Sequence, residues 1–385
     1  MYKWLRICKI KIRFYTMEER TIVFIVTKDC QLSCRYCYLV AKNHNEEMSF
    51  PVAQKTIDYL FSSRILSSNT SIIYDFIGGE PLLRIGLIDM IMEYAITCKH
   101  NIYNISNYKI RITTNGILYN DNEVQKFIKK YQQNLLISIS IDGTKEKNDL
   151  NRIYKNGRGS YDNIINNVKL WRKQFPTLGT RMTISHGDIP YVCDSVKHLI
   201  SLGIKKIDVN PVLEDVWRDG DDHLLETQLI MIADYIVESD LFLDKDVDLT
   251  CFDDFIGHPL EGKDMNNPCG SMFLAIDAKG NFYTCMRFAK YSLRSKLPRI
   301  VGNVENGIDS NKLRPLHALD LQALYPKECL TCEIATGCKW CPAENYDASS
   351  TGTIYQRSTA TCKIHHAKVR AKNYYWNKLY KRING

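Results

Sequence analysis

The sequence has no uninterrupted apolar run of the roughly eighteen residues that a membrane-spanning helix needs, so no membrane association is expected. It also has no internal repeat and no low-complexity segment. The first twenty residues lack the continuous apolar centre and the small-residue cleavage site of a signal peptide, and they alternate basic with apolar side chains instead. These absences favour a cytoplasmic globular protein. With 45% apolar residues, a chain of 385 can form two or three compact units.

Cysteine, by contrast, is abundant. The chain contains 14 cysteines, and in the reducing cytoplasm structural disulfides are rare. So many free thiols favour metal binding over a disulfide scaffold.

Between residues 21 and 211, apolar segments alternate with amphipathic segments of helical periodicity. Strands that alternate with helices are typical of parallel β/α units. The predicted strands are Thr21–Thr27, Ser71–Ile77, Lys109–Thr113, Leu135–Ile141, Thr180–Ile184 and Lys205–Val209. The predicted helices between them are Pro51–Phe61 (with Ser49 as N-cap), Leu87–Cys98, Asn122–Tyr131, Tyr161–Trp171 and Tyr191–Leu202. Six units are too few for a closed eight-stranded barrel, so we predict an α/β fold with a six-stranded partial (β/α)6 TIM-like barrel, open on one side.

The distribution of residue types divides the chain into five segments. We predict a basic N-terminal strand at 1–20, the partial barrel at 21–215, a bridging helix within 216–250, a small cysteine-rich domain at 251–370 and a basic tail at 371–385. The bridging helix is expected at Asp221–Asp240. A second helix, at Lys363–Arg382, is basic and aromatic, and we expect it to pack back on the body.

Three cysteines follow the first predicted strand closely: Cys30, Cys34 and Cys37, in the spacing C-x3-C-x2-C. Three thiolates on one short loop can hold three corners of a cubane iron–sulfur cluster and leave the fourth iron open to another ligand. The loop follows a barrel strand at its C-terminal end, where barrel active sites are built. A zinc site is the alternative, although it would need a fourth ligand from elsewhere in the chain.

One β/α unit later the sequence reads Gly78-Gly79-Glu80-Pro81. Together with the three-cysteine loop, this motif resembles the radical S-adenosylmethionine (SAM) superfamily. The resemblance implies that the open iron chelates SAM and that the enzyme is an oxidoreductase acting through a 5′-deoxyadenosyl radical. It implies that Tyr36 contacts the adenine. Glycines allow close backbone approach, so Gly78, Gly79 and the Glu80 carboxylate are expected at the SAM amino group.

Polar residues at further strand ends complete the implied SAM site. The third strand ends at Thr113–Gly116, and its Asn115 is expected at the cofactor. By the same resemblance, Ser140 would contact the ribose or the methionyl part, Arg152 the carboxylate, and Asn210 the region of the adenine. The alternative for each is turn chemistry or capping, because Asn-Gly and Asp-Gly are good turn formers.

The remaining cysteine-rich stretch resembles the seven-cysteine SPASM extension, which follows radical SAM domains that mostly act on peptides and proteins. By this resemblance, one auxiliary cluster would be held by Cys269, Cys285 and Cys341, and a second by Cys329, Cys332, Cys338 and Cys362. The enzyme would then carry three [4Fe-4S] clusters in all. The gap between Cys338 and Cys341 is one residue shorter than usual. Either Cys251 supplies a fourth ligand to the first auxiliary cluster or one iron stays open, and the residues between Cys329 and Cys341 also allow a zinc ribbon.

We expect no metal-binding role for the cysteines and histidines outside these ligand sets. Cys8, Cys98 and Cys193 are expected to behave as small hydrophobic residues. His365 and His366 are expected on the surface of the last helix.

The net charge of +8 would suit nucleic acid. Ten thiolates around three cluster cores of charge 2+ would remove roughly four positive charges, however, so no nucleic-acid partner is expected. An RNA-modifying radical SAM enzyme remains an alternative of a different class, favoured only by the basic tail. A non-enzymatic metal scaffold is a further alternative, which the intact SAM-binding motifs disfavour.

Among SPASM proteins, residues Cys30 to Leu83 and the segment Asp142–Tyr161 resemble maturases of ribosomally made peptides with repeated cysteine motifs. The resemblance implies hydrogen abstraction from a precursor peptide and formation of a cysteine thioether. An anaerobic sulfatase maturase is the main alternative, but that group carries an acidic base after the second SPASM cysteine, and Met286 stands there. An external flavodoxin- or ferredoxin-type electron donor is expected. Leader recognition would use the barrel rim, the N-terminal strand or a separate leader-binding protein.

The three-cysteine loop gives a direct prediction. The Cys34→Ala chain should lose about four irons per chain and all SAM cleavage, because two thiolates cannot hold the cubane. Cys98→Ala, outside every proposed ligand set, is the matched control and should keep both. Iron analysis and assay of 5′-deoxyadenosine after anaerobic reconstitution measure these effects, and SAM cleavage by the Cys34→Ala chain would refute the assignment.

Overall fold

The computed structural model describes residues 18–385 except 41, 43–45, 68–69, 262–272, 295, 320–324, 339 and 348. Most of the predicted segment 1–20 lies outside the described residues, as do Cys8 and Cys269. Among the helices within the described ranges, none is long and apolar enough to cross a membrane.

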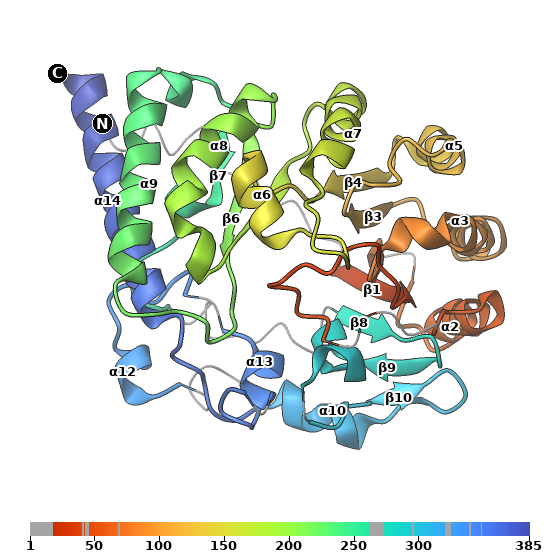
Figure 1. Cartoon of the computed structure of the whole chain (residues 1–385). Helices are drawn as coiled ribbons and strands as arrows, with labels where there is room; N and C mark the ends of the chain where they lie inside the picture. The colour runs from red at the N-terminus through yellow and green to blue at the C-terminus, as the bar shows by residue number, and fades with distance from the viewer. Residues whose placement is uncertain are drawn as a thin grey trace.

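All six predicted barrel strands are present, and they follow one another in parallel β/α order (Figure 1). They are β1 (Glu18–Thr27), β2 (Thr70–Gly78), β3 (Tyr108–Thr114), β4 (Leu135–Ile139), β5 (Thr180–Ile184) and β6 (Lys206–Pro211). Parallel ladders join β1 to β2, β2 to β3, β3 to β4 and β5 to β6. A short β7 (Asp248–Leu249) extends the second group beside β6.

The strands do not form one continuous six-stranded sheet as predicted, because β4 and β5 are not paired in a ladder. The Thr180 side chain stands at this junction. Its hydroxyl donates to the Ile139 carbonyl at 2.7 Å and accepts from the Ile141 amide at 3.5 Å. One buried side chain therefore bridges the point where backbone pairing is interrupted.

The other edge of the first sheet continues into the C-terminal part of the chain. Strand β8 (Phe273–Ile276) pairs in parallel with β1, and β9 (Asn281–Tyr283), β10 (Gly302–Asn303) and β11 (Gly307–Ile308) follow in antiparallel order. The sheet order is β11-β10-β9-β8-β1-β2-β3-β4. The first four barrel strands and the strands β8 to β11 thus share one sheet, although they lie far apart in the sequence.

Strand β1 is buried on both faces, as expected for a central parallel strand. Ile22, Phe24 and Val26 point into the large core beneath the outer helices. Val23 and Ile25 point the other way, into a second core to which the C-terminal part of the chain contributes aromatic residues. The inner face of the partial barrel is therefore filled by the cysteine-rich part of the chain.

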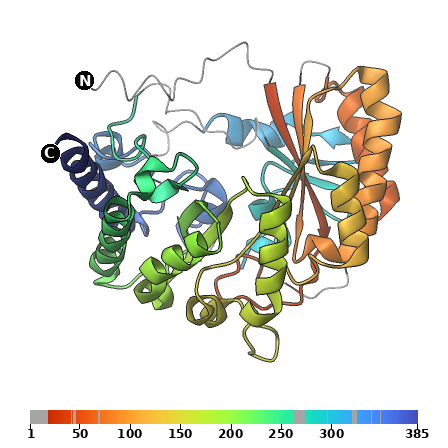
Figure 2. The same cartoon turned by 90° about the horizontal axis from the view of Figure 1, so that it is seen from above.

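Helices follow the strands in the predicted order, and Figure 2 shows them lining the outer side of the curved sheet. They are α2 (Phe50–Ser62), α3 (Ile85–Tyr94), α5 (Asn122–Tyr131), α6 (Lys145–Asn151), α7 (Tyr161–Gln174) and α8 (Val192–Ser201). A π-helix (Ala95–His100) and α4 (Asn101–Tyr103) prolong α3. Ser49 is the N-cap of α2, but its side chain makes no capping hydrogen bond.

The predicted bridging and C-terminal helices lie side by side (Figures 1 and 2). They are α9 (Asp221–Glu238) and α14 (Cys362–Asn384). Ion pairs join them, including Lys378 to Asp234 and Arg370 to Glu226. Helix α14 runs without a break through residue 371, where a separate tail was predicted. The described residues of this part also form three shorter helices: α10 (Ser310–His317), α12 (Lys327–Leu330) and α13 (Pro342–Tyr346).

The junction between β4 and β5 generates a stability prediction. Thr180→Val keeps the shape of the side chain but leaves the Ile139 carbonyl and the Ile141 amide without their partner, and should cost about 1–3 kcal/mol of unfolding free energy. Thr97→Val, at an exposed threonine bonded to the Glu93 carbonyl, should change stability by less than about 0.5 kcal/mol. Urea unfolding of the metal-free chains measures both, and equal midpoints would contradict the bridging role of Thr180.

Candidate functional site

The loop with the three cysteines begins where β1 ends and lies against the end of β2. Gly79 donates its amide to the Thr27 carbonyl at 3.0 Å, and Glu80 donates to the Asp29 carbonyl at 2.7 Å. A Cβ atom at Gly78 would stand 2.1 Å from the Thr27 oxygen, and one at Gly79 would stand 2.2 Å from the Asp29 oxygen. The two glycines therefore let the neighbouring backbone approach, and their expected contact with SAM stays a prediction.

The thiols of Cys30, Cys34 and Cys37 are close enough to influence one another electrostatically. Burial, followed by the Glu80 carboxylate, raises the pKa of Cys30 to about 11. Burial likewise raises the pKa of Cys34, and Arg152 opposes this shift. Such thiols keep their protons at neutral pH, so a metal centre that binds them must displace those protons.

Two nitrogen donors approach this set of thiols. Asn115 donates its side-chain amide to the Cys30 sulfur at 3.6 Å and to the Gln31 side chain at 3.1 Å. Lys42 faces Cys37. Desolvation lowers the pKa of Lys42, but the Cys37 thiol raises it by a hydrogen bond and by its charge, and the net shift is upward. Three cysteine sulfurs, the Asn115 amide and the Lys42 ammonium group therefore lie close together around this loop.

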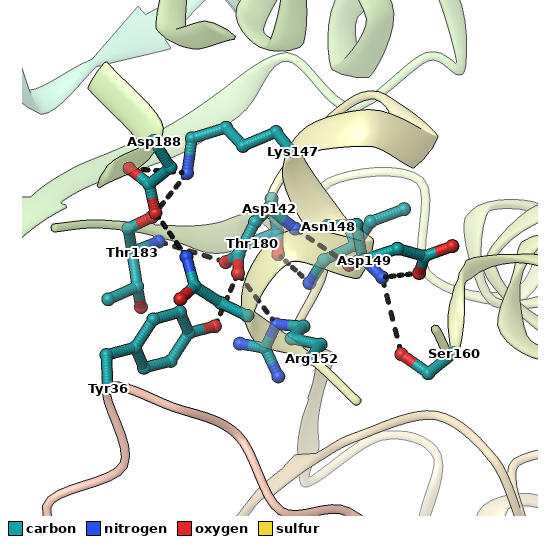
Figure 3. A network of polar contacts seen from close by, with 12 residues as sticks. Tyr36, Asp142, Lys147, Asn148, Asp149, Arg152, Ser160, Thr180, Thr183 and Asp188 are labelled. Atoms are coloured by element: carbon teal, nitrogen blue, oxygen red, sulfur yellow. Dashed lines mark hydrogen bonds and ion pairs between the residues drawn. The ribbon is translucent and has the colours of Figure 1, made fainter. Parts of the chain in front are cut away.

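A buried carboxylate, Asp142, ties this loop to the barrel (Figure 3). It accepts from the Tyr36 hydroxyl, from Arg152 Nε at 3.0 Å and from the Thr183 amide at 3.0 Å. The Arg152 guanidinium also lies over the Tyr36 ring, 5.6 Å from its centroid. Desolvation alone would lower the pKa of Arg152, but Asp142 raises it, so the guanidinium stays charged.

A second buried ion pair stabilises the segments that contact Asp142. Lys147 and Asp188, both with 0% exposed side chains, stand 3.4 Å apart, and Lys147 also donates to the Thr183 carbonyl at 2.6 Å. Asp188 accepts from the Asn151 side chain. The backbone carbonyls of Asn151 and Ile153 in turn accept from the loop amides of Arg35 and Ser33, at 3.0 and 2.7 Å. The cysteine loop is thus held through both side chains and backbone.

The residues predicted to bind SAM divide into two groups. Tyr36, Asn115 and Arg152 are brought together around the loop, as described above. Ser140 and Asn210 lie half-buried at the ends of β4 and β6.

Glu80, which was expected at the SAM amino group, lies where β2 and β3 end. Its fully buried carboxylate accepts from Thr114 at 2.7 Å, Asn115 at 2.7 Å and Leu82 at 3.0 Å. Burial raises its pKa to about 7 despite these hydrogen bonds. Glu80 therefore holds the ends of β2 and β3 together, and its contact with the SAM amino group stays a prediction.

The C-terminal thiols form two groups. Cys285, which follows β9, and Cys341, which caps α13, act on each other electrostatically. Their predicted companion Cys269 lies outside the described residues. Cys338 is influenced by Cys362 and Cys329, and Cys362 by Cys329 and Cys332. The four cysteines predicted to share the second auxiliary cluster are therefore neighbours.

Tyr38 stands between the first loop and the C-terminal thiols. Burial and the charges of Cys37 and Cys285 raise its pKa, while Arg287 opposes the shift. Its hydroxyl lies 3.5 Å from the Met286 sulfur, and the Arg287 guanidinium lies 5.0 Å from its ring centroid. Cys37, Cys285 and Cys341 all pack against the same inner core. The two cysteine regions therefore share one interior.

The remaining cysteines and histidines give mixed outcomes. Cys193 is buried as expected, but Cys98 is exposed. Cys251 is buried in the core, where Lys368 and Asp208 are the charged groups that act on it. The surface expectation is wrong for His365, which is buried with Nε2 2.6 Å from the Ile334 carbonyl.

Within the described part of the chain, no three His, Cys, Asp or Glu side chains converge closely enough to hold a single metal ion. A cubane cluster does not require such convergence, because each thiolate binds a different iron. A loop with three thiols and a group of four neighbouring thiols fit that chemistry.

Several residues of the site had no assigned role in the sequence. Asp142 ends a strand, and that position alone could have singled it out. Lys147, Asp188 and Arg287 carry no local signal, because their partners are distant in the sequence.

Comparison with known proteins relates part of the chain to a known superfamily. Residues 24–190 match the Radical SAM superfamily. An uncharacterised protein of Methanocaldococcus jannaschii is 36% identical over 48% of this chain, and this chain covers 60% of that protein's length. A cysteine-type anaerobic sulfatase-maturating enzyme of Clostridium novyi is 27% identical over 67% of this chain and 71% of that protein.

Solved structures show the same fold. Native anSMEcpe with bound AdoMet aligns with a TM-score of 0.69 at 17% identity, over 95% of this chain and 98% of that one. Streptococcus suis SuiB bound to its precursor peptide SuiA aligns with a TM-score of 0.61 at 15% identity, over 89% of this chain and 76% of that one.

The Asp142 network predicts a large effect from a small change. Asp142→Asn leaves the Arg152 guanidinium buried without its counter-charge, and should cost about 3–5 kcal/mol of unfolding free energy. Asp162→Asn removes an exposed partner of Lys145 (side chain 71% exposed) and should cost less than about 1 kcal/mol. Thermal unfolding of the metal-free proteins measures both, and similar shifts in melting temperature would show that Asp142 is not the anchor.

Proposed function

Because residues 24–190 match the Radical SAM superfamily, we propose that the chain is an enzyme that modifies a peptide with a 5′-deoxyadenosyl radical. The family implies a [4Fe-4S] cluster and SAM, and this pair supplies the one-electron cleavage that makes the radical. Cys30, Cys34 and Cys37 would hold that cluster. Arg152 and the backbone at Gly78 and Gly79 would orient SAM, and the inner core would exclude water.

The single observation that carries this proposal is the shared interior around Tyr38. The Cys37 and Cys285 thiols both act electrostatically on Tyr38, and all three residues pack against the same inner core. A radical centre at the first loop and an auxiliary centre at Cys285 and Cys341 would therefore flank one space. This arrangement supports chemistry that starts with hydrogen abstraction and ends with removal of an electron.

We propose that the product is a cysteine thioether within a ribosomally made precursor peptide. The deoxyadenosyl radical takes one hydrogen atom from a substrate carbon and becomes 5′-deoxyadenosine. The cysteine thiol loses a proton, its sulfur bonds to the carbon radical, and the surplus electron passes to an auxiliary iron–sulfur cluster. The solved structure of SuiB holds its precursor peptide SuiA, and two structures of anSMEcpe hold the Cp18Cys and Kp18Cys peptides. All three support a peptide substrate here.

Oxidation of a protein Cys or Ser, as in sulfatase maturation, is the second candidate. The similarity to the Clostridium novyi enzyme favours it, and so does an acidic pair near the auxiliary thiols. Arg287 bridges Glu214 and Glu344, with both N–O distances at 3.1 Å. Either carboxylate could act as the base. The position directly after Cys285, where sulfatase maturases carry an acidic residue, is occupied by Met286.

A product assay separates the two candidates. The reconstituted enzyme would receive either a cysteine-containing peptide encoded beside its gene or a synthetic peptide with a sulfatase's cysteine site. We expect the first peptide to become lighter by two hydrogen atoms and to lose one alkylatable thiol. Formation of an aldehyde in the second peptide, trapped with a hydrazide, would overturn the thioether proposal in favour of the second candidate.

The auxiliary thiols give a further prediction. The Cys341→Ala enzyme should still cleave SAM but form no crosslinked product, because it keeps the radical site and loses a ligand of the first auxiliary cluster. Cys98→Ala is again the matched control and should form product at the wild-type rate. Mass spectrometry of the peptide and assay of 5′-deoxyadenosine in one reaction measure the ratio of crosslinked peptide to 5′-deoxyadenosine. Normal product from Cys341→Ala would exclude that cluster from the mechanism.

A further inference from the structure

A buried arginine contacts one sulfur of the four-cysteine group, that of Cys338. Arg357, with 5% relative exposure, donates from a terminal guanidinium nitrogen to the Cys338 sulfur at 2.8 Å. Its guanidinium also stacks on Tyr325, 4.2 Å from the ring centroid. The stacking fixes the plane of the guanidinium, so the contact with the sulfur is held rather than fluctuating. Arg357 therefore delivers a full positive charge to one corner of the four-cysteine group.

A second buried cation approaches the same sulfur. Lys368 of α14 is 7% exposed, and the groups that act on it are Cys251, Asp208 and Cys338. Cys338 is thus within electrostatic reach of both a guanidinium and an ammonium group. Because both are buried, solvent screens them poorly.

The other auxiliary thiols have a different electrostatic environment. Among the described residues, Arg287 is a cation near Cys285 and Cys341, and it is paired with Glu214 and Glu344, at 3.1 Å each. One positive charge with two carboxylates gives this triad a net charge of about −1 when both are ionised. The group around Cys338 therefore has the more positive surroundings of the two.

Positive charge and hydrogen bonds to cluster sulfurs stabilise the reduced, more negative state of an iron–sulfur cluster and raise its potential. Building on the proposed function, we propose that Arg357 raises the reduction potential of the cluster held by Cys329, Cys332, Cys338 and Cys362 above that of the cluster at Cys285 and Cys341. An electron removed from the substrate at the first auxiliary cluster then passes to the second. Arg357 is a positioning residue here, because it acts through the Cys338 sulfur.

The test is a potentiometric titration of the reconstituted full chain, followed by electron paramagnetic resonance, with iron counted in the same samples. Arg357→Met removes the charge and the hydrogen bond, whereas Arg357→Lys keeps the charge without the guanidinium plane. Lys372→Met is the matched control, because Lys372 is a buried cation of the same helix that bonds the Ile256 carbonyl. If Arg357→Met loses iron, the titration is made on Lys368→Met instead, which removes the second buried cation near Cys338.

We expect Arg357→Met to shift one of the auxiliary signals to lower potential, Arg357→Lys to shift it less, and Lys372→Met to leave it unchanged. A fully loaded Arg357→Met chain with wild-type potentials would overturn the inference. If Arg357→Met loses iron, unchanged potentials in Lys368→Met would overturn it as well. A wild-type chain with only about four irons would instead refute the three-cluster proposal itself.

Discussion

The buried carboxylate of Asp142 is the constraint on which the candidate site depends. The three-cysteine loop belongs to no helix or strand, so its own backbone cannot fix its place. Asp142 fixes it by accepting from Tyr36 in the loop, from Arg152 after α6 and from Thr183 in β5. Because desolvated charges are costly without partners, this pairing leaves few alternative positions. The Lys147–Asp188 pair then secures the segment whose carbonyls bind the loop amides.

The second organising feature is the two-sided burial of β1. One face of β1 supports the helices of the barrel, and the other supports the core that carries the C-terminal cysteines. The pairing of β8 with β1 makes this arrangement continuous through the sheet. A chain in which the two cysteine regions are about 250 residues apart therefore brings them to one interior, with Tyr38 between them. Packing, rather than local sequence, creates the candidate site.

The sequence predicted most of the helices and strands, which depend on local residue patterns. The six barrel strands and the helices between them lie within a few residues of their predicted positions, because apolar periodicity decides them. The division of the C-terminal cysteines into two ligand sets came from the resemblance to the SPASM extension, and it stays a prediction. Contacts between residues that are distant in the sequence could not be predicted. No residue near Thr180 indicates that β4 and β5 are unpaired, and Tyr36 and Asp142 are 106 residues apart. Glu80 illustrates the same limit, because its motif pointed to a ligand while its three hydrogen bonds are with neighbouring strand ends. Arg357 lies in an irregular segment without any motif.

The central claim is that the chain is a radical SAM enzyme with three iron–sulfur clusters. The most direct test is anaerobic reconstitution with iron and sulfide, a count of metal per chain, and then addition of SAM and a reductant. The account predicts about twelve irons per chain and formation of 5′-deoxyadenosine. Zinc in place of iron, with no 5′-deoxyadenosine, would contradict it.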